Sequence, residues 1–454
     1  MKMKYFAVFL GLSVAASSAM AQQSIKPLWE YLITSEKSPL PILKKNEPTG
    51  NEAWDGTDVY DSYGGFKRYD ENRLLLGVRE NGINESDPNH DAALAAQFPD
   101  RSLIWINPYD GSPMGVALTI GLKPVQLDAD FLADGGSTND YYFTFGVSDD
   151  GVIFTGYKNK ILRYAPDGQG GFSGPTVAYT EPKGDPTYWK AWRWETIKAS
   201  GKGKDTIVFA GGKTWRTDQI YYYFDTQDGL TFAKKKKVGF KGGGSQPYVN
   251  EFNEVMVIGG NYPGGASGFG SDIARYLFAQ GSDEDFYQDP LLQFTAPALD
   301  KDNKNYLDSY IGWFLSGYAA RTGLPYFAVY STPSWDTKDS ETAGTLGFSD
   351  SPVDTPYLPG WLALHGIETG EYIEGSAHML AVYESDELDG DTVNAAGVNP
   401  ASRWHGTLGD MDLYIPAAAT PGSAELLWYS GIYGYGRYVI GDIGETSVAN
   451  WSVY

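Results

Sequence analysis

A short segment, YWKAWRWE (188–195), combines aromatic rings, cations and a carboxylate in a pattern suited to ligand recognition. On an extended strand alternate side chains point to opposite faces, so Trp192 and Trp194 share one face while Arg193 and Glu195 share the other. Tryptophan is mostly buried in folded proteins, and we therefore expect Trp192 and Trp194 to be core residues. Arg193 and Glu195 can hydrogen-bond hydroxyl groups, so we predict that they contact a ligand.

Further tryptophans lie in or near predicted loops, where their flat indole faces could stack on the apolar C–H faces of sugar rings. The predicted ligand-binding tryptophans are Trp189, Trp215, Trp313, Trp335 and Trp404. The same distribution is also expected in any fold built from a chain with 15% aromatic residues. The pattern favours a saccharide ligand, while packing of these rings in the core remains the alternative.

Three residues are candidates for proton transfer or nucleophilic chemistry: Glu195, His378 and His405. A glycoside hydrolase needs two carboxyl groups on opposite sides of the scissile bond, and no partner for Glu195 can be named from the sequence. His365, in the middle of a predicted strand, is expected to be a structural residue.

No metal site is predicted, although Asp410 and Asp412 follow His405 closely, because the chain lacks a histidine motif with fixed ligand spacing. Two acidic loops, 300–308 and 386–394, contain carboxylates that calcium favours, but neither matches an EF-hand. We expect these loops to be solvated and the protein to need no cofactor.

The N-terminus predicts export. Residues 1–21 combine an early positive charge, an apolar run and small residues before Gln22, as in a secretory signal peptide cleaved near Ala21. The run is short for a membrane span and no second candidate follows, so we expect no membrane insertion. The protein is predicted to be secreted or periplasmic. The absence of cysteine excludes thiol nucleophiles and thiolate metal sites.

The formal net charge of −22 argues against a nucleic acid partner, because an acidic surface repels phosphate groups. The one basic run, Lys234–Lys237, is expected on the solvent side of an exposed strand, where lysines block edge-to-edge pairing. The expected partner is an extracellular glycan or a surface protein, and we expect a monomer.

Composition and repetition predict an all-β fold. The chain has 55 glycines and 33 tyrosines, and short apolar runs bounded by Gly, Asp and Pro recur along it. Examples are DGVIFTGYK (150–158), DTIVFAGGK (205–213) and NEVMVIGGN (253–261). Most are followed by a second strand and an Asp-Gly or Thr-Gly turn.

This repetition predicts a single-domain β-propeller of six or seven four-stranded blades. The predicted boundaries are an N-terminal segment at 22–59, the propeller at 60–445, and a C-terminal tail or closing strand at 446–454. In such a fold the first strand of each blade lines the central channel. An array of two-sheet sandwiches is the competing architecture, but no domain linkers are found.

The turn phrases NPYDGSP (107–113), APDGQGG (165–171) and IETGEY (367–372) are similar to those of secreted bacterial β-propeller proteins. The resemblance spans roughly residues 60–440 and is not specific to one family. DTQDGLTF (225–232) also resembles a sialidase Asp box, one residue short. It occurs once and without an arginine triad, so the resemblance implies no sialidase activity.

Three functions fit these observations. The first is glycan binding through aromatic loops on one face of the propeller. The second is a carbohydrate-active enzyme, a glycoside hydrolase or polysaccharide lyase, or a lactonase. The third is a protein-interaction or surface scaffold, because a fold does not determine a function.

Overall fold

The computed structural model describes the chain in segments: residues 24–32, 39, 63–78, 92–99, 101–120, 133, 144–183, 192–213, 220–238, 248–249, 254–261, 272–279, 292–295, 313–333, 361–379, 409–430, 434–444 and 452–453. In the fourth sheet and at several strand ends only the backbone is described. A helix, α2 (Ala92–Gln97), and a 3-10 turn, η3 (Gly203–Asp205), accompany the strands.

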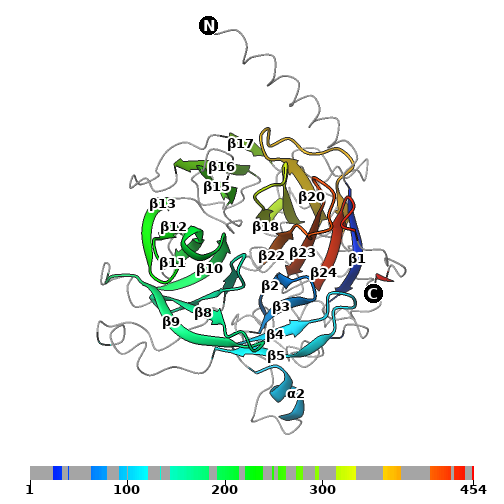
Figure 1. Cartoon of the computed structure of the whole chain (residues 1–454). Coiled ribbons are helices and arrows are strands. Elements are labelled where there is room, and N and C mark those ends of the chain that lie inside the picture. The colour runs from blue at the N-terminus through cyan, green and yellow to red at the C-terminus, as the bar shows by residue number, and fades with distance from the viewer. Residues whose placement is uncertain are drawn as a thin grey trace, which may run out of the picture.

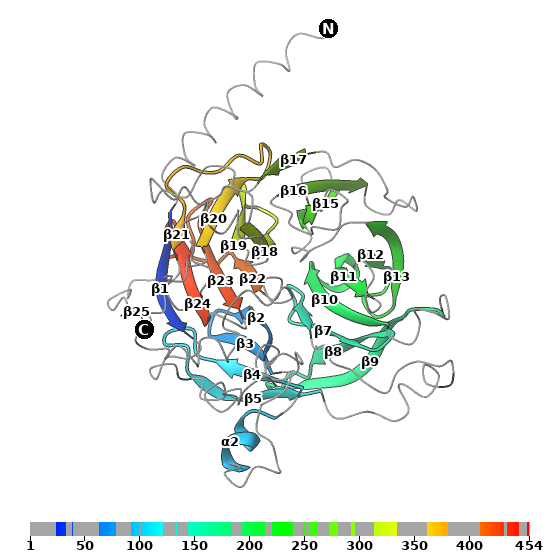
Figure 2. The same ribbon diagram turned by 180° about the vertical axis from the view of Figure 1, so that it is seen from behind.

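The described strands form six sheets arranged as a ring in chain order (Figures 1 and 2). The first sheet contains β2 (Tyr63–Asp70), β3 (Arg73–Val78), β4 (Ser102–Ile106) and β5 (Pro113–Thr119). The second contains β6 (Phe145–Val147), β7 (Ile153–Tyr157), β8 (Lys160–Pro166) and β9 (Phe172–Thr180). The third contains β10 (Arg193–Ser200), β11 (Ile207–Lys213), β12 (Ile220–Thr226) and β13 (Phe232–Val238).

The fourth sheet contains β14 (Tyr248–Val249), β15 (Glu254–Asn261), β16 (Asp272–Ala279) and β17 (Leu292–Thr295). The fifth contains β18 (Trp313–Ala320), β19 (Tyr326–Pro333), β20 (Trp361–Gly366) and β21 (His378–Met379). The sixth, here called the closing sheet, runs in the order β22 (Gly409–Tyr414), β23 (Ala424–Ser430), β24 (Gly434–Ile440), β1 (Ile25–Leu32) and β25 (Ser452–Val453).

The predicted all-β propeller with four-stranded blades is therefore confirmed, but the predicted number of six or seven such blades is wrong. Five of the described sheets have four strands, and the closing sheet has five. The difference arises because both ends of the chain enter the closing sheet. β1 pairs antiparallel with β24 from Ile25↔Ile440 to Leu32↔Gly434, and β25 pairs parallel with β1. Backbone pairing between the two chain ends closes the ring.

Apolar clusters fill the seams between neighbouring sheets. In the seam between the second and third sheets, Trp194 is 2% exposed and packs with residues of both sheets, and Trp192 packs against this cluster. The two indole rings meet edge to face, with ring centroids 5.5 Å apart. The prediction that these two tryptophans are core residues is confirmed.

Two glycines make room for these rings. A Cβ atom on Gly156 of the second sheet would lie 2.7 Å from Trp194 Cβ. A Cβ on Gly212 would lie 2.7 Å from Trp192 Cζ2. The glycine that follows the apolar run in these two strands is therefore a packing requirement, since any side chain would collide with a neighbouring tryptophan.

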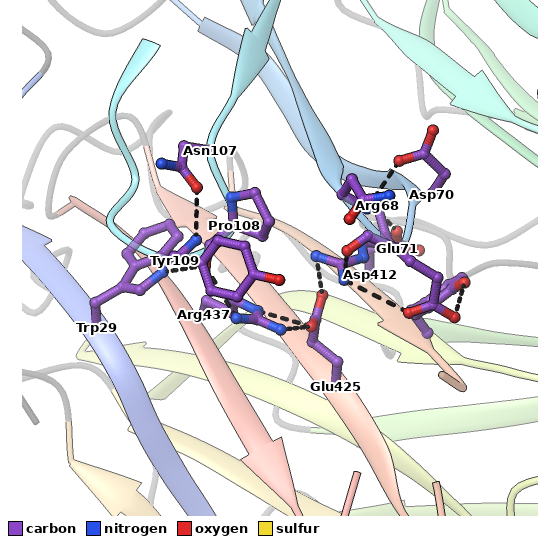
Figure 3. Close-up of polar contacts among 12 residues, drawn as sticks. Trp29, Arg68, Asp70, Glu71, Asn107, Pro108, Tyr109, Asp412, Glu425 and Arg437 are labelled. Carbon is purple, nitrogen blue, oxygen red and sulfur yellow. Dashed lines mark hydrogen bonds and ion pairs between the residues drawn. The ribbon is translucent and has the colours of Figure 1, made fainter. Parts of the chain in front are cut away.

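The seam between the closing sheet and the first sheet is polar as well as apolar (Figure 3). Glu425 is fully buried and accepts a hydrogen bond from Arg437 Nε at 2.7 Å. Arg68 Nη1 of the first sheet lies 3.3 Å from Glu425 Oε1, an ion pair without hydrogen-bond geometry. The carbonyl oxygen of Pro108, in the β4–β5 turn, accepts from Arg437 Nη1 and Trp29 Nε1. Ring closure thus depends on buried charges and on backbone carbonyl groups of the first sheet.

Three features noted in the sequence have structural roles. Lys234 lies on β13, the edge strand of the third sheet, and forms a 2.8 Å ion pair with Glu181, which directly follows β9 of the second sheet. His365 is 1% exposed, stacks on Phe327 and donates from Nδ1 to the Gly370 carbonyl oxygen at 2.9 Å. In the segment that resembles an Asp box, Asp228 caps its hairpin turn by accepting two backbone N–H groups. No described helix is long and apolar enough to cross a membrane.

Candidate functional site

The first strand of each sheet faces the axis of the ring, so these strands form the frame of any axial site (Figures 1 and 2). The innermost strands are β2, β6, β10, β14, β18 and β22. Each ends in the connection to the second strand of its own sheet. We call this the turn end of the axis, and the end at which these strands begin the strand-start end. Neighbouring inner strands pack together, as β18 and β2 do on either side of β22.

Two buried lysines from different sheets converge on one carbonyl group at the axis. Lys67 on β2 donates to the Met411 carbonyl oxygen at 3.3 Å, and Lys198 on β10 donates to the same oxygen at 3.5 Å. Their exposed fractions are 1% and 5%. The third sheet and the closing sheet lie three positions apart in the ring, so Lys198 reaches across the axis.

A buried carboxyl group lies beside these lysines. Asp412, the residue after Met411 on β22, is 3% exposed and accepts a hydrogen bond from the Arg68 backbone N–H at 2.8 Å. Burial raises the pKa of the Asp412 carboxyl, although the positive charges of nearby lysine and arginine side chains act to lower it. We refer to Lys67, Lys198 and Asp412 as the axial cluster. It can stabilise anionic groups and can supply a proton from a carboxyl group.

Charged side chains also meet at the turn end. Arg321, in the β18–β19 turn of the fifth sheet, forms a 2.7 Å ion pair with Asp149, in the β6–β7 turn of the second sheet. These sheets are three positions apart, so the pair crosses the axis. The Arg321 guanidinium also lies over the Tyr414 ring of β22, 5.9 Å from its centroid. The turn end is therefore bridged by side chains from three sheets.

The structure places three of the predicted ligand-binding residues on inner strands at the strand-start end. Arg193 and Glu195 lie at the beginning of β10, and Trp313 begins β18. Only their backbone is described. The pairing of β10 with β11 shifts register between Trp194 and Thr196, so Glu195 lies where the ladder is interrupted by a β-bulge or a similar irregularity. Bulges re-aim side chains and are frequent beside active sites.

The other candidates are separated from this group or lie outside the described residues. His378 lies on β21, the outermost strand of the fifth sheet, and its Nε2 is 2.9 Å from Glu30 Oε2 on β1. Tyr438 donates to the same oxygen at 2.7 Å, so His378 joins the fifth sheet to the closing sheet far out in the blades. The remaining candidates lie outside the described residues: Trp189, Trp215, Trp335, Trp404 and His405.

The lysines of the axial cluster are not among the residues predicted from the sequence. Nothing in the segments around Lys67 and Lys198 distinguishes these lysines from surface residues, because strand alternation gives two faces without saying which one points to the axis. Asp412 was considered only as a neighbour of His405 in a possible metal site. Its alternation with the core residues Met411 and Leu413 was the one available signal.

The two acidic loops considered for calcium, 300–308 and 386–394, lie outside the described residues. Among the residues that the structure describes, no group of three or more histidine or acidic side chains could hold a metal ion.

Comparisons with known proteins give no family. No family model matches the chain, and no curated protein matches it. A Penicillium chrysogenum α-L-arabinanase complexed with arabinobiose is 9% identical, with a TM-score of 0.41 over 86% of this chain and 98% of that one. The SapL1 lectin in complex with α-methyl fucoside is 9% identical, with a TM-score of 0.40 over 85% and 97%. A luciferin-regenerating enzyme is 6% identical, with a TM-score of 0.41 over 85% and 93%. Similarities this low say nothing about activity.

Proposed function

We propose that the protein is an exported carbohydrate-active enzyme whose reaction takes place on the axis of the propeller, at the strand-start side of the axial cluster. The observation that supports this proposal is the chemical character of the axis. A site built only for sugar binding would be lined by aromatic and amide side chains. The described charged side chains at this axis are instead two lysines and a carboxyl group, with the Arg321–Asp149 ion pair at the turn end.

The reaction that fits best is hydrolysis of a glycosidic bond by two carboxyl groups. One must be protonated to donate to the leaving oxygen, and the other must be ionised to act as base or nucleophile. Asp412 suits the acid role because burial raises the pKa of its carboxyl. Glu195 is the second carboxyl residue, and its strand β10 lies across the axis from β22. The Lys198 side chain of β10 reaches the carbonyl group next to Asp412, so side chains from the two strands meet at the axis.

The test is turnover on a panel of purified polysaccharides, followed by release of reducing ends and by titration calorimetry. We expect Asp412→Asn and Glu195→Gln each to lower kcat by at least 10²-fold, because each removes a proton-transfer group. Asp228→Asn is the matched control, since Asp228 lies in an exposed hairpin turn. Turnover that survives both axial substitutions would contradict this proposal.

Glycan binding without turnover is the second candidate function. It is supported by Trp313, which begins inner strand β18 at the same end as Arg193. In that case calorimetry gives a saturating isotherm that Trp313→Ala weakens, with no continuous heat after each injection. Failure of every polysaccharide in both assays would favour the scaffold function.

We also propose export of the chain with cleavage after Ala21 and a monomeric mature protein. N-terminal sequencing of the expressed protein, with Gln22 as the expected first residue, tests the cleavage. Sedimentation equilibrium of the same sample tests the oligomeric state.

A further inference from the structure

We propose that Lys67 and Lys198 are positioning residues for the proposed acid Asp412. Their contacts with the Met411 carbonyl group fix the segment of β22 that carries Asp412, and their positive charges set the upper limit of the pH range in which this acid stays protonated. The catalytic role of Asp412 rests on the proposed function, whereas the contacts of the two lysines are independent of it.

The Met411 carbonyl group is held by side chains. β22 is the first strand of the closing sheet, so one of its edges faces the axis instead of another strand of that sheet. Backbone groups along such an edge need other partners, because a buried carbonyl group without a hydrogen bond is costly. The Met411 carbonyl oxygen accepts from Lys67 Nζ at 3.3 Å and from Lys198 Nζ at 3.5 Å. The two lysines thus take the place of a neighbouring strand at this point of β22.

Two consecutive residues of β2 hold two consecutive residues of β22. The Lys67 side chain reaches the Met411 carbonyl group, and the Arg68 backbone N–H donates to the Asp412 carboxyl at 2.8 Å (Figure 3). The Met411 side chain packs into the apolar cluster between the fifth sheet and the closing sheet, so strand alternation turns Asp412 away from that cluster. Lys198 reaches the same carbonyl group from β10, three sheet positions away. The Asp412 segment is therefore held from two directions, one of them across the axis.

The cations that act on the Asp412 carboxyl come from three elements. Burial raises the pKa of this carboxyl, and the positive charges of Lys67 on β2, Arg321 in the β18–β19 turn and Lys198 on β10 oppose that rise. Arg321 is also paired with Asp149 across the axis. Removing one of these cations disfavours the ionised carboxyl, whichever other groups the cation contacts. The variant is then expected to hold the proton of the acid to a higher pH.

The other described ionisable groups near Asp412 on β2, β22 and β23 have partners outside the axial cluster. The Arg68 guanidinium lies 3.3 Å from Glu425 of β23. Tyr414, two residues along β22, donates to Glu71, and burial raises the pKa of Tyr414 to about 12, so this side chain is uncharged at neutral pH. Control of the Asp412 charge is therefore assigned to the two lysines, with a contribution from the arginine at the turn end.

The first experiment needs no substrate. Infrared spectroscopy follows the stretching band of a protonated carboxyl group, and the band of Asp412 is the one that Asp412→Asn removes. Lys67→Gln and Lys198→Gln keep a hydrogen-bond donor for the Met411 carbonyl group but lose the charge. We expect the band to persist to higher pH in each variant than in the unsubstituted protein. A band that titrates at the same pH in all three proteins would overturn the proposal.

The second experiment measures kcat/KM against pH on each polysaccharide of the panel that is turned over. The alkaline limb, where a general acid loses its proton, should move to higher pH in both glutamine variants, so that relative activity on this limb rises roughly tenfold. Lys67→Arg and Lys198→Arg keep the charge and should leave the limb in place. Lys198→Met removes the donor as well and should lower kcat further with little change in KM. A lower kcat with an unmoved limb in every variant would mean a purely structural role and would overturn the proposal.

Two further variants complete the test. Lys234→Gln, on the edge strand β13, is the matched control and should leave both the band and the limb unchanged. Arg321→Gln removes a partly exposed cation and serves if the lysine variants fail to fold. It should move the band in the same direction, and an unmoved band would overturn the role of positive charge at Asp412.

The two readouts separate this inference from the proposed function. If the band moves but no polysaccharide is turned over, the positioning contacts stand and the proposed function fails. If turnover is found but neither the band nor the limb moves, the proposed function stands and this inference fails.

Discussion

The two faces of β10 bury different kinds of side chain, apolar ones on one face and a charged one on the other. Trp194, Ile197 and Ala199 pack into the apolar seam with the second sheet. Lys198, between two of these residues, is buried to nearly the same degree but reaches across the axis to the closing sheet. The buried fraction of a side chain therefore does not show whether the residue contributes to apolar packing or to a charged site.

The two kinds of burial change the free energy of folding in opposite directions. Apolar burial stabilises the fold by roughly 25 cal/mol per Å² removed from water. Burying a charge costs free energy, and replacing a buried ion pair by apolar residues is often neutral or stabilising. The seam is thus explained by stability. Burying the charges of the axial cluster costs free energy, and this contrast is the reason for proposing chemistry at the axis.

The largest effect is expected in the aromatic seam. Trp194→Ala should lower the free energy of unfolding by about 3–5 kcal/mol, because the indole fills a site that both sheets enclose. Urea unfolding followed by circular dichroism measures the change. Trp194→Phe keeps part of the ring volume and should cost clearly less. A loss below about 1 kcal/mol for the alanine variant would contradict the assignment of Trp194 to the core.

Glu425 is a buried charge with a structural role in the seam between the closing sheet and the first sheet. Glu425→Gln should lower the free energy of unfolding by roughly 3 kcal/mol, because it leaves Arg68 and Arg437 as buried cations without their shared carboxylate. Asp70→Asn is the control, since the Asp70–Arg73 pair is partly exposed and should contribute at most about 1 kcal/mol. If both variants lowered the free energy of unfolding equally, the seam between the closing sheet and the first sheet would have to be hydrated.

His365 tests how strongly the apolar interior excludes charge. Burial lowers the pKa of His365 from 6.5 to about 4, so the unfolded chain binds a proton more readily than the folded one between these values. Stability from this group is therefore complete above about pH 6.5 and is lost as pH falls toward 4.

The corresponding free energy is on the order of 3 kcal/mol. Urea unfolding at pH 7 and pH 4.5 should show the loss in the unsubstituted protein and a smaller loss in His365→Gln. The same pH dependence in both proteins would exclude His365 as its source.

Several strands and turns could be predicted from the sequence because residues close together along the chain determine them. Short apolar runs ending in glycine, such as that ending at Gly156, predicted strands of a propeller, and Asp-Gly phrases predicted hairpin turns. Alternation placed Trp192 and Trp194 together, and the structure confirms that they are packed in a seam. The strand content of the closing sheet was not predictable, because pairing between β1 and β24 joins residues more than 400 positions apart.

Local sequence patterns predict the fold class, the strand and turn segments and the buried tryptophans, because each pattern involves residues only a few positions apart along the chain. The charges that meet at the axis depend on the folded ring. Lys67, Lys198 and Asp412 come from three sheets, and their contacts exist only after the ring has closed. These contacts cannot be predicted from the spacing of the residues along the chain. The side chains come together because each sheet is rotated about the axis relative to the one before it.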